Sequence, residues 1–263
     1  MIRWMAVAAV AAVVMLGAAL LVVGCGGVVV GSGNLVTKGY DLEGFTRLDV
    51  SDSFEVEVTR SDTYSVELTL DDNLIDEVDV RVEGETLSID LKGTTAHERT
   101  TQRAKIALPE LAEVVLSGAS KASVEGFSSS GDLELVLSGA SSLVLTDMAA
   151  GDAKFDVSGA SKVNGAVGVG DVQMDVSGAS NVDLEGSGAE ASLDASGASS
   201  LRLEDLALES ASVHLSGSST ATLDVAGTLD ADLSGASILR LRGSPILREI
   251  ETAGSSEIRS IGE

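Results

Sequence analysis

The residue with the most definite chemistry in this chain is Cys25, the only cysteine among 263 residues. It follows an uncharged apolar run over residues 4–23, which is itself preceded by Arg3. A positive residue, an apolar stretch and a small residue before a cysteine are typical of a bacterial lipobox, in which a peptidase cleaves before the cysteine and the thiol is acylated. Gly24 is the small residue at the cleavage point. The pattern predicts a lipoprotein signal peptide over residues 1–24 and lipidation of Cys25.

The alternative is an uncleaved N-terminal anchor, because about 20 apolar residues are also enough to span a membrane. Val22 stands at a lipobox position where Leu is commoner, whereas the placement of the single cysteine favours the lipoprotein. Under both interpretations the rest of the chain lies outside the cytoplasmic membrane. Gly26 follows Cys25 in place of the Asp that retains lipoproteins in the inner membrane of enteric bacteria. We therefore expect an outer-membrane location where the host has an outer membrane.

Carboxylates supply the second candidate chemistry. One position of a sequence repeat carries Asp156, Asp175, Asp194 and Asp232, with His214 interrupting the column. Stacked carboxylates repel each other, and Ca²⁺ relieves such repulsion by binding oxygen ligands. A second column holds the Gly-Asp pairs that end at Asp132, Asp152 and Asp171. We favour solvated outward positions that keep the sheets soluble, because the glycine-aspartate nonapeptide spacing of calcium-binding β-rolls is absent.

Catalytic groups are scarce. His97 and His214 are the two histidines, and neither lies in a recognisable motif. Residues 117–239 hold four cations against eighteen acidic residues, so an acidic polysaccharide would meet a repelling potential. The whole chain carries 41 acidic and 17 basic residues, a net charge of −24, and loss of Arg3 with the signal peptide makes this −25. Such a charge also excludes nucleic acid as a partner.

The composition indicates a thin, repetitive core. Hydrophobic residues make up 44% of the chain, which excludes a disordered acidic tail, but aromatic residues make up only 3% and there are 29 glycines. A Ser-Gly-Ala-Ser block begins at Ser117, Ser138, Ser158, Ser177, Ser196 and Ser234, with variants at Ser216 and Ala253. The seven intervals between these positions run from 18 to 21 residues and average about 19.4.

Counted from the first residue of the block, most repeats have apolar residues one and three positions before it and five and seven positions after it. This alternation predicts a strand, a small-residue corner and a second strand, and such short strands become stable only by stacking turn upon turn. We therefore predict an all-β fold, a right-handed parallel β-helix with repeats of about 20 residues. The corner glycines suit a positive φ.

The chain before the first block is less regular. Residues 46–50, 54–59, 64–70, 78–82 and 86–91 alternate apolar with polar residues and are predicted strands. Residues 73–77 indicate a helical turn, and the polar segment 92–103 a loop. We divide the mature chain into a lipidated N-terminus and tether over residues 25–33 and a solenoid domain over residues 34–263. Within the domain, residues 34–116 form an irregular capping half and residues 117–263 the regular repeats.

Several short motifs carry a family resemblance. They are GSGN at 31–34, YDLEGF at 40–45, FEVEV at 54–58, DDNL at 71–74, the Ser-Gly-Ala-Ser ladder and GSP at 243–245. With these motifs the mature chain resembles the family called putative auto-transporter adhesin, head GIN domain. The resemblance implies a β-helix similar to pectin-lyase-type solenoids and a secreted or lipid-anchored envelope protein. It brings no catalytic residue that matches a position of this sequence.

These observations predict a non-enzymatic, lipid-anchored protein of the cell envelope, a surface-binding or adhesion-type module. We expect a membrane contact through the lipid on Cys25 and an unidentified protein or glycan ligand, and we assign no catalytic, metal-ligating or cofactor-binding residue. One alternative is a carbohydrate-active, pectin-lyase-like β-helix enzyme, which needs paired carboxylates or a base with charge neutralisation. A second is a structural or signalling module of the envelope.

Overall fold

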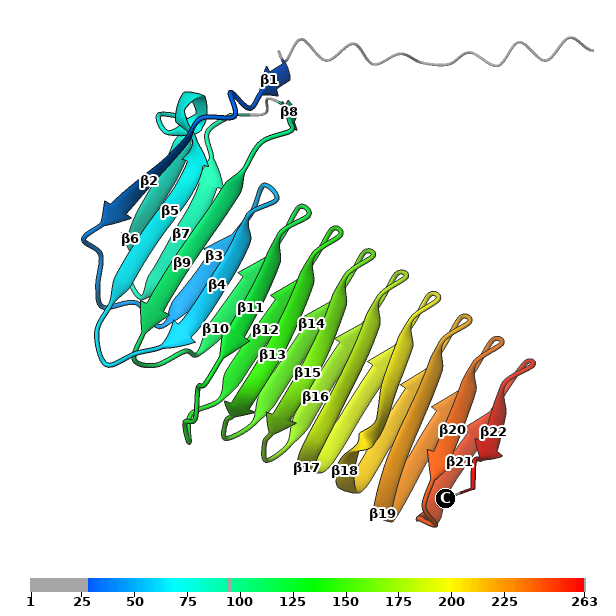
Figure 1. Cartoon of the computed structure of the whole chain (residues 1–263). Helices are drawn as coiled ribbons and strands as arrows, with labels where there is room; N and C mark the ends of the chain where they lie inside the picture. Colours follow the sequence, from blue (N-terminus) through cyan, green and yellow to red (C-terminus); the bar gives the residue numbers. More distant parts are fainter. Residues whose placement is uncertain (1–27, 94–95, 263) are drawn as a thin grey trace, which may run out of the picture.

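A computed structural model describes residues 28–93 and 96–262 (Figure 1). Apart from turns and bends, these residues form strands and one short 3₁₀ helix, η1 (Asp72–Leu74). No helix in these two ranges has the length and apolar character needed to cross a membrane. The strands build one elongated body with β1 near one end and β22 at the other (Figure 1). The predicted all-β solenoid is confirmed.

Each turn of the solenoid contributes one strand to each of two faces, and neighbouring turns pair in parallel. Face A consists of β3 (Arg47–Val50), β10 (Glu113–Leu116), β12 (Leu133–Leu137), β14 (Ala153–Val157), β16 (Val172–Val176), the ends of β17 (Asn181–Ala195), β18 (Ser200–Leu215) and β19 (Thr220–Leu233), and β21 (Ile246–Thr252). Face B consists of β4 (Glu55–Arg60), β11 (Lys121–Glu125), β13 (Ser142–Ala149), β15 (Lys162–Gly168), the beginnings of β17, β18 and β19, β20 (Ile238–Arg242) and β22 (Glu257–Ser260). Strands β17, β18 and β19 therefore run without interruption from face B of one turn into face A of the next.

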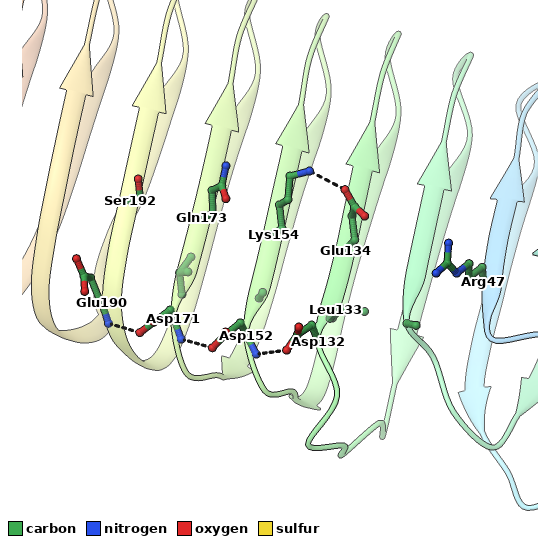
Figure 2. A pocket seen from close by; sticks show the side chains of 13 residues that line it. Arg47, Asp132, Leu133, Glu134, Asp152, Lys154, Asp171, Gln173, Glu190 and Ser192 are labelled. Atoms are coloured by element: carbon green, nitrogen blue, oxygen red, sulfur yellow. Dashed lines mark hydrogen bonds and ion pairs between the residues drawn. The ribbon is translucent and has the colours of Figure 1, made fainter.

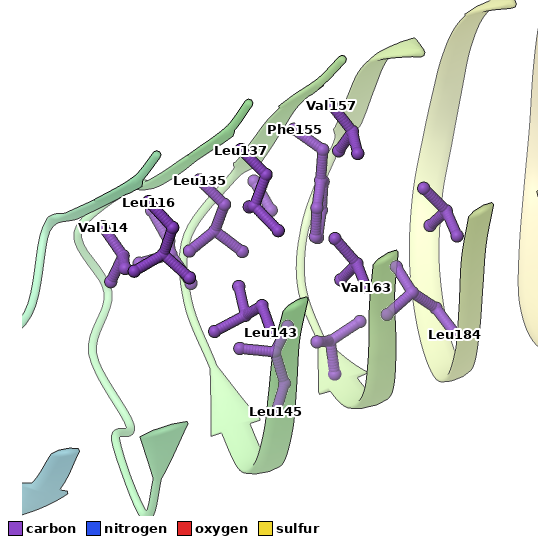
Figure 3. Packing of buried hydrophobic residues seen from close by; sticks show 14 of the residues in the cluster. Val114, Leu116, Leu135, Leu137, Leu143, Leu145, Phe155, Val157, Val163 and Leu184 are labelled. Atoms are coloured by element: carbon purple, nitrogen blue, oxygen red, sulfur yellow. The ribbon is translucent and has the colours of Figure 1, made fainter. Parts of the chain in front are cut away.

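The core lies between the two faces and follows from the alternation of the strands. The position just before the corner block is buried at every block except the last, where Thr252 is exposed; the buried residues are Leu116, Leu137, Val157, Val176, Ala195, Leu215 and Leu233. Leu143 and Val163 meet this layer from face B (Figure 3). Phe155 is a rare ring in these aliphatic ladders (Figure 3). One layer of side chains from each face thus fills the interior, which explains the low aromatic content.

The Ser-Gly-Ala-Ser block forms the corner from face A to face B. Its glycines have φ values of +71° to +76°, a region that L side chains disfavour. Ala198 N donates to Gly178 O at 2.8 Å, and the equivalent bond recurs between successive corners. A Cβ on Gly197 would lie 2.6 Å from Gly178 O, so glycine is required by both the φ value and the stacking. The last serine points inward, as where Ser219 Oγ donates to Ser216 O at 2.7 Å.

Antiparallel strands cover the N-terminal end of the core. Strands β7 (Thr86–Leu91) and β9 (Gln102–Leu108) extend faces A and B by one parallel strand each. Beyond them, β6 (Val78–Glu83) pairs antiparallel with β7, β5 (Ser65–Asp71) with β9, and β2 (Leu35–Tyr40) with β5. The five strands predicted between residues 46 and 91 are confirmed. The solenoid itself begins earlier than residue 117, because β3, β4 and β10 already form its rungs.

Two segments differ from the sequence-based expectation. Residues 92–103, expected as a loop, contain β8 (Ala96–Glu98) and the beginning of β9. Residues 28–30, expected within a tether, form β1 (Val28–Val30), which pairs in parallel with β8. Backbone hydrogen bonding rather than apolar patterning makes this pair, so the polar sequence of β8 gave no signal. The helical turn expected over residues 73–77 is the shorter η1.

Candidate functional site

A shallow depression of about 540 Å³ lies on the outer surface of face A and crosses the strands from β3 to β17 (Figure 2). Two rows of polar side chains line it. The row at the strand beginnings contains Asp132, Asp152, Asp171 and Glu190. The row two residues further along contains Arg47, Glu134, Lys154, Gln173 and Ser192. The floor between them is made by small and aliphatic residues such as Ala112 and Val172.

The first row ties successive turns together. Asp132 Oδ1 accepts the backbone N–H of Asp152 at 3.1 Å, and Asp152 Oδ1 accepts that of Asp171 at 2.8 Å. The series continues from Asp171 Oδ1 to the N–H of Glu190 at 3.2 Å (Figure 2). Each carboxylate keeps a second oxygen that makes no hydrogen bond with the described residues. The predicted Gly-Asp column is therefore brought together, and its carboxylates have a structural role.

The glycines of the second and third Gly-Asp pairs make room for the carboxylate of the preceding turn. A Cβ on Gly170 would lie 2.6 Å from Asp152 Oδ1, and one on Gly151 would lie 2.9 Å from Asp132 Oδ1. Neither glycine has a positive φ, so the requirement here is space rather than backbone conformation. The recurrence of the pair in the sequence thus records a packing contact between turns.

The second row supplies the cations of the depression, and both are paired. Lys154 Nζ donates to Glu134 Oε1 at 2.7 Å (Figure 2), and this hydrogen bond raises the pKa of the Lys154 ammonium. Arg47 Nη1 lies 3.3 Å from Glu113 Oε2. Because five carboxylates line the depression with these two cations, its net charge is negative. Polyanionic ligands are disfavoured here, as the composition predicts.

The other predicted column lies further along face A. Register pairs bring Asp156 beside Asp175, Asp175 beside Asp194, and His214 between Asp194 and Asp232. All five side chains are exposed, as an outward position requires. His214 Nδ1 lies 3.2 Å from Asp232 Oδ2. Within residues 28–93 and 96–262, no three His, Cys, Asp or Glu side chains surround a point where a metal ion could bind.

The column that contains Asp156 begins at Asp49 on β3. Asp49 lies next to the N-terminal cap, by which we mean strands β2, β5, β6, β7 and β9. Packing around its carboxyl group and the nearby charge of Asp90 raise the pKa of Asp49, and the charge of Arg81 opposes this. Arg81 contacts Asp79 Oδ2 at 2.7 Å and Asp90 Oδ2 at 3.0 Å. These contacts join the cap strands β6 and β7 and leave Asp49 as a carboxylate whose ionisation the fold disfavours.

The predicted lipidation site and the side chain of one of the two histidines lie beyond what the structure describes. Cys25 precedes the first described residue, so its lipidation stays a prediction. His97 lies in β8, but its side chain is outside the described part. The sequence did not single out the row from Arg47 to Ser192. Its signal was present four positions before the first five blocks, where the residues are Glu113, Glu134, Lys154, Gln173 and Ser192, so that the residue type changes at each step from Glu134 to Ser192.

Comparisons with known proteins agree with this architecture. No curated protein matches the chain. A crystal structure described as a putative lipid binding protein from Parabacteroides distasonis has a TM-score of 0.78 and 17% identity, and the match covers 89% of this chain and 99% of that one. A putative adhesin from the same species has a TM-score of 0.79 and 19% identity, with 89% and 100% covered. A putative adhesin from Parabacteroides merdae has a TM-score of 0.75 and 20% identity, with 89% and 99% covered.

At these identities the three structures establish a shared fold and nothing finer. The sequence itself gives the stronger relation, because residues 44–245 match the family described as "Putative auto-transporter adhesin, head GIN domain". The matched range contains face A from β3 to β19 and all of the residues that line the depression. The chain belongs to this family of adhesin-like head GIN domains.

Proposed function

We propose that the chain is a non-enzymatic, lipid-anchored module of the bacterial envelope that binds an extended ligand along the depression of face A. The single observation that carries this proposal is the row of polar side chains that differ from turn to turn, laid across an otherwise repetitive face. Carboxylate oxygens, the Gln173 amide and the Ser192 hydroxyl can accept hydrogen bonds along this line. The ligand should therefore carry hydrogen-bond donors and no net negative charge, as in neutral glycans or Lys-rich protein segments.

Membership of an adhesin-like family supports binding rather than turnover. The geometry of the depression also favours binding, because one carboxylate oxygen of Asp132, Asp152 and Asp171 each accepts a hydrogen bond from a backbone N–H of the next turn. Lys154 is held by Glu134 and is poorly placed to neutralise a substrate carboxylate. A glycosidase or lyase needs carboxylates or a base released for proton transfer.

The binding proposal is tested by filling the depression. Ser192→Tyr places a ring over it, and Ser212→Tyr is the matched control, since Ser212 is its register neighbour in the next turn and lies outside the depression. We expect Ser192→Tyr to weaken binding to a neutral glycan array or to Lys-rich peptides by about tenfold or more, with little change for the control. Equal effects of the two substitutions would contradict the proposal.

The enzyme alternative is tested on the same glycans. Release of reducing ends by the wild-type chain, lost in a variant of the depression, would replace the binding function with a carbohydrate-active one. Binding without release supports the module proposed here. The structural or signalling alternative predicts no ligand for the depression and equal behaviour of wild type and Ser192→Tyr in every binding assay.

The anchor is tested by metabolic acyl labelling of the full-length chain beside Cys25→Ala. We expect label in the wild type alone, at the molecular mass of residues 25–263. Label retained by Cys25→Ala, or a mass that includes residues 1–24, would contradict cleavage and acylation at Cys25.

A further inference from the structure

Exposed aliphatic side chains gather at the end of the body where the chain enters. Val28, Val30 and Leu35 are 54%, 51% and 51% exposed, and Val36 is 41% exposed. Other large exposed hydrophobic residues in the described part are Val144 on face B and three residues of β21 at the far end. Leu35 and Val36 are consecutive residues of β2 and point to opposite faces of the sheet. Val28 and Val30 are alternate residues of β1 and point to the same side, and we call these two the N-terminal apolar patch.

The segment that carries the patch is fixed to the fold. Val29, between the two exposed valines, packs against the core, and β1 pairs with β8. The N–H of Gly31 donates to Glu98 O at 3.1 Å, and Asn73 Nδ2 donates to Val30 O at 3.0 Å. These contacts hold β1 in one orientation relative to the domain.

A buried carboxylate fastens the next residues. Asp71 is 1% exposed and accepts the N–H of Gly33 at 2.7 Å and that of Thr101 at 2.7 Å. Ser32 Oγ donates to Asp72 Oδ1 at 2.5 Å. The segment from β1 to β2 is thus hydrogen-bonded to η1 and to Asp71 of β5, which also binds the residue just before β9. These bonds fix the position of the segment relative to the domain.

Covalent geometry places this patch close to the proposed lipid. Cys25 and Val28 are three residues apart, so their Cα atoms are separated by at most about 11 Å even in a fully extended chain. An acyl chain on Cys25 would enter the bilayer, and the boundary between headgroups and acyl chains is the depth at which an attached apolar surface is buried by about 5–10 Å. A lipid surface is therefore the one partner that the anchor itself brings to Val28 and Val30.

From this we infer that the N-terminal apolar patch is a membrane-contact surface, which rests on a zwitterionic lipid leaflet when Cys25 is anchored. The inference builds on the anchor in the proposed function. Because β1 is fixed to the cap, contact by the patch orients the whole domain. The turns then extend away from the lipid, since β1 and β22 lie at opposite ends of the body (Figure 1). Face A and its depression stay open to ligands along their length.

The test uses Cys25 as a chemical handle, so that it does not depend on acylation in the cell. Residues 25–263 contain one cysteine and, because Trp4 leaves with the signal peptide, no tryptophan. The chain is coupled through the Cys25 thiol to a maleimide lipid in phosphatidylcholine vesicles. Val30→Trp then reports on the patch, and Val144→Trp, at a similarly exposed position on face B, is the matched control.

We expect the emission of Val30→Trp to shift to shorter wavelength on coupling and to be quenched by brominated phosphatidylcholine several-fold more strongly than that of Val144→Trp. Adding Val28→Ser should reduce the quenching, while circular dichroism and the melting temperature of the uncoupled chain show that the fold is retained. Equal, weak quenching at both positions would overturn the inference. A shift to shorter wavelength without quenching by brominated lipid would indicate contact between copies of the chain and would also overturn the inference.

Acyl labelling of Cys25 in cells tests the anchor separately. Label on Cys25 together with equal quenching at the two tryptophans would leave the anchor standing and refute the membrane contact. Strong quenching of Val30→Trp without acyl label in cells would support the membrane contact and refute the anchor. The patch would then bind lipid only when the thiol is tethered artificially.

Discussion

Replacing a corner glycine by alanine tests how the turns stack. Gly197 has a φ of +74°, and an alanine at this φ costs about 1–2 kcal/mol. Its Cβ would also lie 2.6 Å from Gly178 O, the acceptor of the 2.8 Å hydrogen bond from Ala198 N. Overpacking adds about 1–3 kcal/mol and a weakened hydrogen bond about 1 kcal/mol. We expect Gly197→Ala to lower the free energy of unfolding by about 3–6 kcal/mol.

Two further glycines separate these contributions. Gly84 has a φ of +62° with no atom within 4 Å of an added Cβ, so Gly84→Ala should cost only the conformational 1–2 kcal/mol or so. Gly39 has neither a positive φ nor a close neighbour, and Gly39→Ala should be neutral or slightly stabilising. Urea denaturation gives the order of the three variants. Amide hydrogen exchange then locates the loss, which should be largest in the turns on either side of Gly197 because neighbouring turns support each other. A loss for Gly197→Ala no greater than that for Gly84→Ala would refute the stacking argument.

Three smaller substitutions test other contacts. Ser219→Ala removes a buried hydrogen bond and should cost about 1 kcal/mol in urea denaturation, whereas Ser180→Ala removes a hydroxyl without a partner in the described residues and should be neutral or stabilising. Asp152→Ala should speed hydrogen exchange at the Asp171 amide, and Asp152→Asn, which keeps an acceptor oxygen, should restore protection. Asp49→Asn should raise stability at pH 7, because the fold raises the pKa of Asp49 and so penalises its ionised form. That gain should vanish as the pH falls below about 4, and a gain that persisted there would contradict the assignment.

The regular part of the fold was predictable because one physical requirement recurs in every turn. Leu137 and Val157 must face inward, and Gly139 must reverse the chain at a positive φ. Each requirement leaves a mark in the sequence at a spacing of about 20 residues. The parallel pairing of turns follows, since short strands with one apolar side gain a core only by stacking.

At the N-terminal end of the core, β5, β6 and β7 were predicted as strands, whereas β2, β9 and the antiparallel pairing were not. Alternation in β5 and β6 indicates which side chains face the core, yet the same alternation suits a parallel or an antiparallel neighbour. The pairing of β1 with β8 left little mark, because backbone groups make it and the side chains of Val28 and Val30 remain exposed. Backbone hydrogen bonds pair β1 with β8, and only Val29 of β1 packs against the core, so this pair leaves little apolar pattern in the sequence.

The Asp columns show how a repeated motif can suggest a site where the structure has a contact between turns. The Gly-Asp pairs recur because Asp152 must bond the next turn and Gly170 must leave space for that carboxylate. A contact needed at several turns is expected to repeat, and a group that recognises one ligand is not. In the row through Arg47, Lys154 and Ser192, ion pairs join some neighbouring turns, but no backbone contact that repeats from turn to turn fixes the residue type.

This contrast locates specificity on the outward positions. The features that the fold requires repeat from turn to turn. A ligand that contacted only these repeated features would bind with nearly the same free energy after a shift by one turn. A change from Glu134 to Lys154 to Gln173 along one line removes that equivalence, because each turn then presents a different charge or hydrogen-bonding group. An extended ligand crossing the depression would therefore be held in one register, which is what selective recognition on a repetitive surface requires.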